Sequence, residues 1–195
     1  MATAGKAGLR ERLLTGRRSV SDDAHAQEAR SLAAHLDALT INGGHTVCAY
    51  VPVGAEPGSI EMLDVLLRQA DRVLLPVTRT TGDDSAMALL WAEYRPGQLV
   101  TARFGLLEPA GPWLPSTALA DATVLFVPAL AVDRTGARLG RGRGFYDRTL
   151  VLRDPHARLI AIVRDEELLD EVPHQPHDVP MDAIVTEAGV FRSAR

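Results

Sequence analysis

A stretch rich in glycine and arginine is the part of the chain whose residue types most clearly indicate chemistry. An apolar run, residues 124–132, leads into residues 133–148, here called the glycine–arginine loop. The loop holds four glycines and five arginines: Gly136, Gly140, Gly142, Gly144, Arg134, Arg138, Arg141, Arg143 and Arg148. Glycines let backbone N–H groups approach a ligand, and arginine forks donate bidentate hydrogen bonds to phosphate or carboxylate. The loop therefore predicts an anion site, with a solvated surface turn as the alternative interpretation.

The glycine spacing excludes two common nucleotide-binding loops. No G-x-x-x-x-G-K-[ST] sequence is present, and Gly140-x-Gly142-x-Gly144 lacks the final spacing of a dinucleotide-binding fingerprint. The loop does lie between an apolar strand and a helix expected to open at Phe145. Because anions bind at such junctions in α/β folds, its position strengthens the prediction.

Two aspartates are candidates for holding a metal ion that would accompany a phosphate. Asp147 follows the last loop glycine, and Asp178 lies in a proline-bracketed loop that could reach the same end of the sheet. Mg²⁺ typically takes one or two protein carboxylates together with phosphate oxygens. A transition-metal site of His174 and His177 with Asp178 is the alternative. A structural loop is the preferred interpretation of the histidines, because an HxxH pattern there has poor specificity.

Composition and charge narrow the class of protein. The 195 residues, 46% hydrophobic and 24% charged, are typical of one soluble globular domain. The net charge of −4 argues against a nucleic-acid binder, whereas the five Arg and two Asp of the loop give a local +3 that suits a small anion. No apolar run could span a bilayer or act as a leader. The single cysteine, Cys48, excludes an intramolecular disulfide and predicts a buried thiol in a cytoplasmic protein.

Hydrophobic periodicity predicts strands that alternate with helices, and hence an α/β sheet with helices on both faces. Strands are expected at residues 45–53, 72–77, 87–94, 121–128, 158–163 and 181–186. Helices are expected at residues 5–18, from the Ser21 cap to a stop at Asn42-Gly43-Gly44, from the Ser59 cap to residue 70, at 146–153 and at 166–171.

Three further features concern the surroundings of the loop. The helix at residues 5–18 is amphipathic and carries Lys6 and Arg10 on its polar side, although pattern alone favours a solvated terminal helix. Glu56 follows the first strand, at the carboxyl edge where ligands sit in open sheets. Residues 95–120 show no period and predict a long, partly ordered loop, in which Phe104 and Trp113 either cover a flat ligand or pin the loop.

The ordered motifs resemble the 5-formyltetrahydrofolate cyclo-ligase family, whose members are also called 5,10-methenyltetrahydrofolate synthetases. The central match is Arg138-Leu-Gly-Arg-Gly-Arg-Gly-Phe-Tyr-Asp-Arg148, and the resemblance covers nearly the whole chain. Supporting matches are Lys6…Leu9-Arg10, Tyr50-Val-Pro…Glu56, Leu75-Pro76, Phe104-Gly…Glu108-Pro109 and His177-Asp178…Asp182-Ala-Ile-Val-Thr186.

The resemblance implies a fold and a reaction. The fold would be a three-layer α/β/α sandwich with a central mostly parallel sheet, similar to sugar-phosphate isomerases and CoA-transferases. Residues 1–195 would form one domain, with the basic helix (residues 1–20) contributing to an ATP site. The reaction would convert 5-formyltetrahydrofolate and ATP, with Mg²⁺, into 5,10-methenyltetrahydrofolate, ADP and phosphate through an iminophosphate intermediate. A cytoplasmic monomer without nucleic-acid or membrane partners is expected.

The resemblance also carries roles onto individual residues. Arg141 and Arg143 would stabilise the transferring phosphoryl group, and Tyr146 would frame the site. ATP contacts fall on Lys6, Arg10, Arg138, Leu139, Gly140, Arg141, Gly142, Arg143, Gly144, Phe145 and Tyr146. Folate contacts fall on Val51, Glu56, Arg141, Gly142, Arg143, Gly144 and Phe145, and metal contacts on Asp147 and Asp178.

One residue departs from the family pattern, and two other functions stay open. Phe145 stands where the family usually has a tyrosine, so the ring is kept and the hydroxyl is lost. Activity is expected to persist if that side chain contributes packing.

The alternatives are a folate- or nucleotide-binding regulator without turnover, and another enzyme on the same architecture. The second would need a catalytic Glu or Lys elsewhere, and Lys6 is the only lysine.

Overall fold

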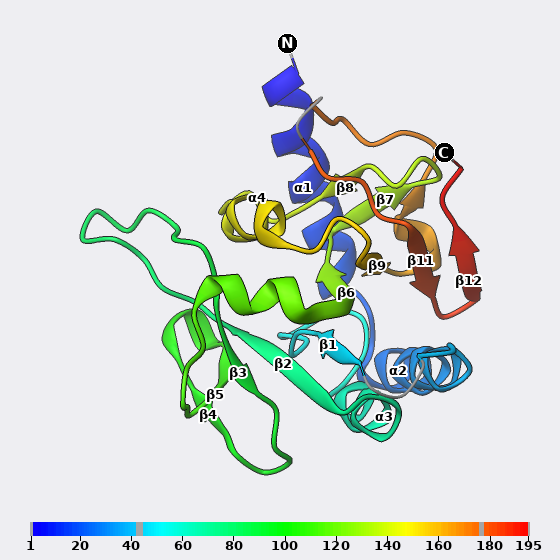
Figure 1. Cartoon of the computed structure of the whole chain (residues 1–195). Coiled ribbons are helices and arrows are strands. Elements are labelled where there is room, and N and C mark those ends of the chain that lie inside the picture. Colours follow the sequence, from blue (N-terminus) through cyan, green and yellow to red (C-terminus); the bar gives the residue numbers. More distant parts are fainter. Residues whose placement is uncertain (1, 42–44, 176–177, 195) are drawn as a thin grey trace.

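A seven-stranded sheet forms the centre of the computed structural model, which describes residues 2–41, 45–175 and 178–194. Its strands are β1 (Thr46–Cys48), β2 (Arg72–Val77), β3 (Leu90–Glu93), β6 (Ala122–Pro128), β9 (Arg158–Ile162), β11 (Ala183–Thr186) and β12 (Gly189–Arg192). Across the sheet they lie in the order β12-β11-β9-β6-β1-β2-β3 (Figure 1). The five inner strands are parallel and the two edge strands are antiparallel. This arrangement confirms the predicted mostly parallel α/β sheet.

All six predicted strands are present, with two differences. The first strand is only Thr46–Cys48, although Ala49 N still donates to Leu74 O at 2.9 Å. The edge strand β12 was not predicted, since its four residues alternate between half-buried and exposed and form no apolar run. The inner strands β6 and β9 are almost entirely buried because helices cover both faces of the sheet.

One face of the sheet is covered by α2 (Asp22–Asp37) and α3 (Glu61–Gln69), which lie side by side in Figure 1. The predicted cap of α2 is confirmed, because Ser21 Oγ accepts a hydrogen bond from Ala24 N at 3.3 Å. The N-cap of α3 is Ile60 rather than Ser59, although Ser59 Oγ still accepts from Glu61 N. The predicted helix stop at residues 42–44 lies outside the described residues.

The opposite face is covered by shorter pieces. These are η2 (Ser116–Asp121), α4 (Phe145–Thr149) and η3 (Leu150–Leu152), and their apolar residues pack in a core that includes Trp91 of the edge strand β3 and Leu125 of the inner strand β6. The helix predicted at residues 146–153 is therefore α4 followed by a 3-10 turn. Cys48 lies in this core and is buried, as predicted.

The N-terminal helix α1 (Ala2–Arg18) packs on a small separate sheet rather than lying fully in solvent. That sheet consists of β7 (Ala131–Asp133), β8 (Arg138–Leu139) and β10 (Leu168–Leu169), and its side chains contact Leu9 and Leu13 of α1. The helix predicted at residues 166–171 is wrong: a 3-10 turn, η4 (Asp165–Glu167), leads into β10 because Leu168 and Leu169 pair with β7.

The prediction of a long, partly ordered loop at residues 95–120 is also wrong. The segment contains a hairpin of β4 (Leu99–Thr101) and β5 (Leu107–Pro109), the turn η1 (Arg103–Gly105) and η2. Such short pieces leave no periodic pattern, and partners elsewhere hold them. Glu108 accepts hydrogen bonds from Thr78 N and Thr78 Oγ1 at 2.7 and 2.6 Å, and Trp91 pairs with Leu114.

None of the helices in the described parts of the chain is both long and apolar enough to cross a membrane.

The buried carboxylate of Asp133 organises the base of the glycine–arginine loop. Its Oδ1 accepts from Thr135 N, Thr135 Oγ1 and Ala137 N, and its Oδ2 accepts from Val172 N. Burial alone would raise the pKa of Asp133, but these hydrogen bonds more than offset it and lower the pKa below its usual value. Asp133 therefore joins the loop to the segment that follows β10.

Replacing Asp133 by Asn should destabilise the protein by about 2 kcal/mol at pH 7, because the amide NH₂ would face a backbone donor. The folded pKa is below the unfolded value, so the carboxylate's contribution is complete above about pH 4 and disappears as pH falls through the folded pKa. Urea unfolding at pH 7 and pH 3.5 should show the deficit shrinking with acid. Asp37→Asn, at an exposed pair with Arg68, is the control. A deficit that is equal at both pH values would contradict this role.

Candidate functional site

A cavity of about 280 Å³ opens at the carboxyl edge of the sheet, between the ends of β1 and β6. Successive strands are added to the sheet in opposite directions from this point, since β2 lies on one side of β1 and β6 lies on the other. Tyr50 and Val51 follow β1, and Pro128 and Ala129 come from the end of β6. Ligands of open α/β sheets bind at such a switch point, so the topology and the cavity indicate the same place.

The glycine–arginine loop forms one wall of this cavity, and every residue from Gly140 to Asp147 lines it. Gly136 is required by the close approach of another backbone segment, and Gly142 by its left-handed backbone conformation. A Cβ on Gly136 would lie 2.3 Å from Met181 O, and Gly142 has a φ of 91° with the Arg10 guanidinium beside it. Arg10 Nε donates to Gly140 O at 2.9 Å, which ties helix α1 to the loop.

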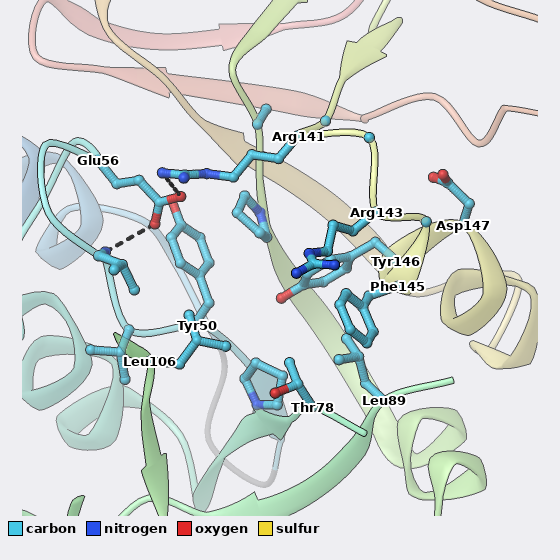
Figure 2. Close-up of a pocket in the computed structure, with 18 of the residues that line it drawn as sticks. Tyr50, Glu56, Thr78, Leu89, Leu106, Arg141, Arg143, Phe145, Tyr146 and Asp147 are labelled. Atoms are coloured by element: carbon cyan, nitrogen blue, oxygen red, sulfur yellow. Dashed lines mark hydrogen bonds and ion pairs between the residues drawn. The ribbon is translucent and has the colours of Figure 1, made fainter. Parts of the chain in front are cut away.

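Three loop arginines contact carboxylates from three different parts of the chain. Arg138 Nη2 lies 2.8 Å from Asp147 Oδ1, Arg141 Nη2 lies 2.8 Å from Glu56 Oε1, and Arg143 Nη1 lies 3.9 Å from Asp84 Oδ2. Figure 2 shows the Arg141 side chain reaching across to Glu56, away from Arg143 and Asp147. The positive charge predicted for the loop is thus partly offset by carboxylates of the protein itself.

Glu56 occupies the wall opposite the loop, in a turn whose backbone is fixed. Only 8% of the residue is exposed, and its Oε2 accepts from Val53 N at 3.0 Å. His25 Nε2 lies 2.9 Å from Glu56 O, and Arg164 Nη1 donates to the neighbouring Ala55 O at 3.1 Å. The Glu56 carboxylate is therefore held at the cavity, whereas a glutamate in a turn is usually exposed to solvent.

Two tyrosines present protonated hydroxyl groups in the same region. Burial raises the pKa of Tyr146 well above its usual value, and burial followed by the charge of Glu56 does the same for Tyr50. The Tyr146 hydroxyl is buried and has no hydrogen-bond partner among the described residues. Figure 2 shows the hydroxyl of this ring directed toward the side of the cavity where Tyr50 lies. A buried hydroxyl without a partner is costly, so a bound ligand is a natural acceptor for it.

A third wall of the cavity was missed by the sequence analysis. It consists of Pro76, Thr78, Leu89, Leu106, Leu107 and Glu108. Most of these residues follow β2 or belong to the segment predicted as an irregular loop, and only the Glu108-Pro109 and Leu75-Pro76 matches pointed to them. Trp113 does not line the cavity: the Arg79 guanidinium lies 4.1 Å from its ring centre, so it pins the segment. The Phe104 side chain lies outside the described residues.

Four predicted site residues are not among those that line the cavity. Arg10 contacts the loop backbone from outside, and the Leu139 side chain is buried in the small core beneath α1. Lys6 and Asp178, predicted for ATP and metal respectively, lie together, with Lys6 Nζ 3.4 Å from Asp178 Oδ2. Val51, Glu56, Arg138 and residues 140–147 do line it, so most predicted contacts are brought to one place.

The carboxylates present suit a hard cation that arrives with a phosphate rather than a preformed metal centre. In the described parts of the chain, no three His, Cys, Asp or Glu side chains gather to hold a metal. His174 Nδ1 lies 3.2 Å from Val172 O, and His177 is outside the described residues. Asp147 places one largely exposed carboxylate at the cavity. One or two carboxylates completed by phosphate oxygens is the usual donor set of Mg²⁺.

Comparison with known proteins agrees with this geometry. The model of the 5-formyltetrahydrofolate cyclo-ligase family matches residues 2–187. A 5-formyltetrahydrofolate cyclo-ligase of Mycolicibacterium smegmatis is 55% identical over 95% of both chains. One of Escherichia coli is 33% identical over 75% of this chain and 80% of its own length.

Solved structures show the same fold. The NMR structure of Aquifex aeolicus 5,10-methenyltetrahydrofolate synthetase matches with a TM-score of 0.79 at 24% identity, covering 97% of this chain and 93% of that one. A 5,10-methenyltetrahydrofolate synthetase from Mycoplasma pneumoniae matches with a TM-score of 0.71 at 20% identity, covering 93% and 98%. The family predicted from the loop motif is thus confirmed: the chain belongs to the 5-formyltetrahydrofolate cyclo-ligase family of enzymes.

Proposed function

We propose that this enzyme converts 5-formyltetrahydrofolate and MgATP into 5,10-methenyltetrahydrofolate, ADP and phosphate through a phosphorylated formyl group. The observation that carries the proposal is the 2.8 Å contact between Arg141 and Glu56. Arg141 belongs to the loop predicted to bind phosphate, and Glu56 is the residue predicted to bind the pterin. Their contact means that a phosphate and a pterin bound to them would meet in one cavity.

The proposed chemistry proceeds in two steps. The formyl oxygen attacks the γ-phosphorus, and the bond from that phosphorus to the bridging oxygen breaks, so ADP leaves with the electron pair. N10 then attacks the formyl carbon and the carbon–oxygen bond breaks. Phosphate leaves with that pair, and the N10 proton is lost to it. Phosphorylation is needed because an amide oxygen is otherwise a very poor leaving group, and positioning of the two substrates lowers the first barrier.

The roles of the cavity residues follow from their positions. Arg141 and Arg143 stabilise charge on the transferring phosphoryl group, and Arg138, Lys6 and Arg10 neutralise or support the rest of the nucleotide. The loop amides from Leu139 to Gly144 approach the phosphates closely. Glu56 accepts hydrogen bonds from pterin N–H groups, while Val51 and Phe145 pack on the folate. Phe145 needs no hydroxyl for this role, since its ring already packs against the core.

Asp147, at the cavity, would hold Mg²⁺, and Asp178, which lies outside the cavity beside Lys6, would have to approach it to be a second ligand. The ion supplies charge neutralisation for the phosphate oxygens when it is bound. The Arg138 side chain is only 10% exposed and contacts Asp147 Oδ1, so it keeps this carboxylate directed along the loop.

The central test is the reaction itself. The purified protein with 5-formyltetrahydrofolate and MgATP should form the near-ultraviolet absorption band of methenyltetrahydrofolate, with one ADP released per product. Omission of either ATP or Mg²⁺ should abolish the signal. Binding of both ligands without product would instead identify a regulator, and would rule out the proposed reaction.

Asp147→Asn should lower kcat about a hundredfold or more and raise the Mg²⁺ concentration needed for half-maximal rate. The amide oxygen can still accept from Arg138, so the metal role is isolated from the ion pair. Asp121→Asn is a matched control, because Asp121 makes a similar exposed contact of 2.9 Å with Arg72 at the opposite end of β6. Unchanged Mg²⁺ dependence in Asp147→Asn would remove the metal assignment.

Tyr146→Phe should lower kcat about tenfold or more with little change in Tm, because the hydroxyl that is lost has no partner until substrate binds. Tyr94→Phe provides the contrast. The Tyr94 hydroxyl donates to Asp64 Oδ1 at 2.8 Å, remote from the cavity, so that variant should lose stability and keep activity. Full activity in Tyr146→Phe would show that only the ring matters.

A further inference from the structure

The contact between Arg141 and Glu56 places a residue for each substrate in direct competition. We propose that Glu56 is a specificity-determining residue that makes ATP use depend on folate. Without folate, Glu56 holds Arg141 away from the phosphates; with folate, the pterin N–H groups replace the guanidinium, and Arg141 becomes available to the γ-phosphoryl group. The inference rests on the proposed function and adds to it the suppression of phosphoryl transfer to water.

The two partners of this ion pair differ in burial, and that difference decides which one moves. The Glu56 side chain is 11% exposed, whereas the Arg141 side chain is 50% exposed. A buried carboxylate without a partner is costly, but a half-exposed guanidinium can return to water with little penalty. Glu56 therefore exchanges one partner for another, and Arg141 leaves.

The carboxylate is also anchored and the guanidinium is not. The turn of Glu56 is fixed by Val53 N, by His25 and by Arg164 at the preceding carbonyl. Arg141, in contrast, starts from the glycine-rich loop and reaches Glu56 only through its extended side chain (Figure 2). Gly140 and Gly142 flank it, and neither has a side chain that could block another rotamer of Arg141.

Arg141 and a pterin would approach the Glu56 carboxylate from the same cavity. Glu56 Oε2 already accepts from Val53 N, and Oε1 accepts from Arg141 Nη2. Each carboxylate oxygen can accept two hydrogen bonds, so Oε2 can keep Val53 N, but a pterin edge with two adjacent N–H donors would need the cavity side of the carboxylate, where the guanidinium lies. On the arginine, both bidentate edges of a guanidinium include Nη2, so the contact to Glu56 occupies one of the two edges that could grip a phosphate.

The neighbouring pair of the loop has the opposite asymmetry. Arg138 is the buried partner there and Asp147 is 60% exposed, so the arginine stays and the carboxylate can turn to a metal ion. Exchange of the guanidinium is therefore a property of the pair with Glu56, not of every ion pair on the loop.

The proposed competition between folate and Arg141 would slow the hydrolysis of ATP by water. When ATP binds alone, attack of a water oxygen on the γ-phosphorus would release ADP with the bridging electron pair and lose a proton to solvent. An arginine that stabilises the transferring phosphoryl group lowers this barrier as well as the productive one. Keeping Arg141 on Glu56 until folate arrives leaves the wasteful reaction slow.

The test is the coupling between the two substrates, measured by calorimetry with the Mg²⁺ complex of a non-hydrolysable imido analogue of ATP. For the wild type, saturating 5-formyltetrahydrofolate should tighten analogue binding about fivefold, and the analogue should tighten folate binding by the same factor. Glu56→Gln should bind the analogue tightly without folate and show no coupling. It should also hydrolyse ATP without folate several-fold faster than the wild type, and its KM for folate should rise.

Arg141→Ala provides a second, independent variant, because its side chain is half exposed and its loss does not threaten the fold. It should bind the analogue weakly with or without folate. Asp121→Asn should behave as the wild type. Equal analogue affinity with and without folate in the wild type, or persistent coupling in Arg141→Ala, would overturn the inference. If the wild type makes no methenyl product, the proposed function itself fails, which is a distinguishable result.

Discussion

A buried chain of ion pairs sets the shape of the cavity. Glu167 receives Arg17 Nε and Nη2 at 2.6 and 2.8 Å, and its Oε2 also accepts from Arg164 N at 2.9 Å. The side chain of each arginine also donates a hydrogen bond to a backbone carbonyl in one wall of the cavity. Arg17 Nη2 donates to Ala129 O at 2.7 Å, and Arg164 Nη1 donates to Ala55 O. Ala129 directly follows β6, and Ala55 directly precedes Glu56. The Glu167 carboxylate therefore links the wall at the end of β6 to the wall that holds Glu56.

This arrangement explains why charged residues lie inside a core that could be apolar. A buried ion pair often adds little net stability, but loss of one partner leaves an uncompensated charge that costs about 3–5 kcal/mol. The pairs therefore penalise displacement of α1, which carries Arg17, and of α2, whose Glu28 contacts Arg164 Nε at 2.9 Å. The Arg141 side chain, in contrast, is half exposed and contacts Glu56 at the edge of this network.

The sequence predicted what depends on local pattern and missed what depends on pairing at a distance. Apolar runs identified all six predicted strands, and the spacing of Gly140, Gly142 and Gly144 identified the loop that lines the cavity. Glu167 was placed in a helix because nothing in its neighbours reveals that Arg17, 150 positions earlier, lies against it. The wall around Thr78 and Glu108 escaped for the same reason, since a hydrogen bond across 30 residues leaves no periodicity.

The charges of the loop are best understood as a set of exchanges. Arg138, Arg141 and Arg143 contact carboxylates of Asp147, Glu56 and Asp84, and the two carboxylates from outside the loop, Glu56 and Asp84, reduce its formal +3 to +1. Under the proposed function, each of these carboxylates contacts an arginine that a phosphate of MgATP would otherwise contact. An anion that engages one arginine gains less than the charge count suggests, whereas one that engages several while a second ligand takes Glu56 gains the whole. Under the proposed function, these contacts would favour binding of the two substrates together over binding of either one alone.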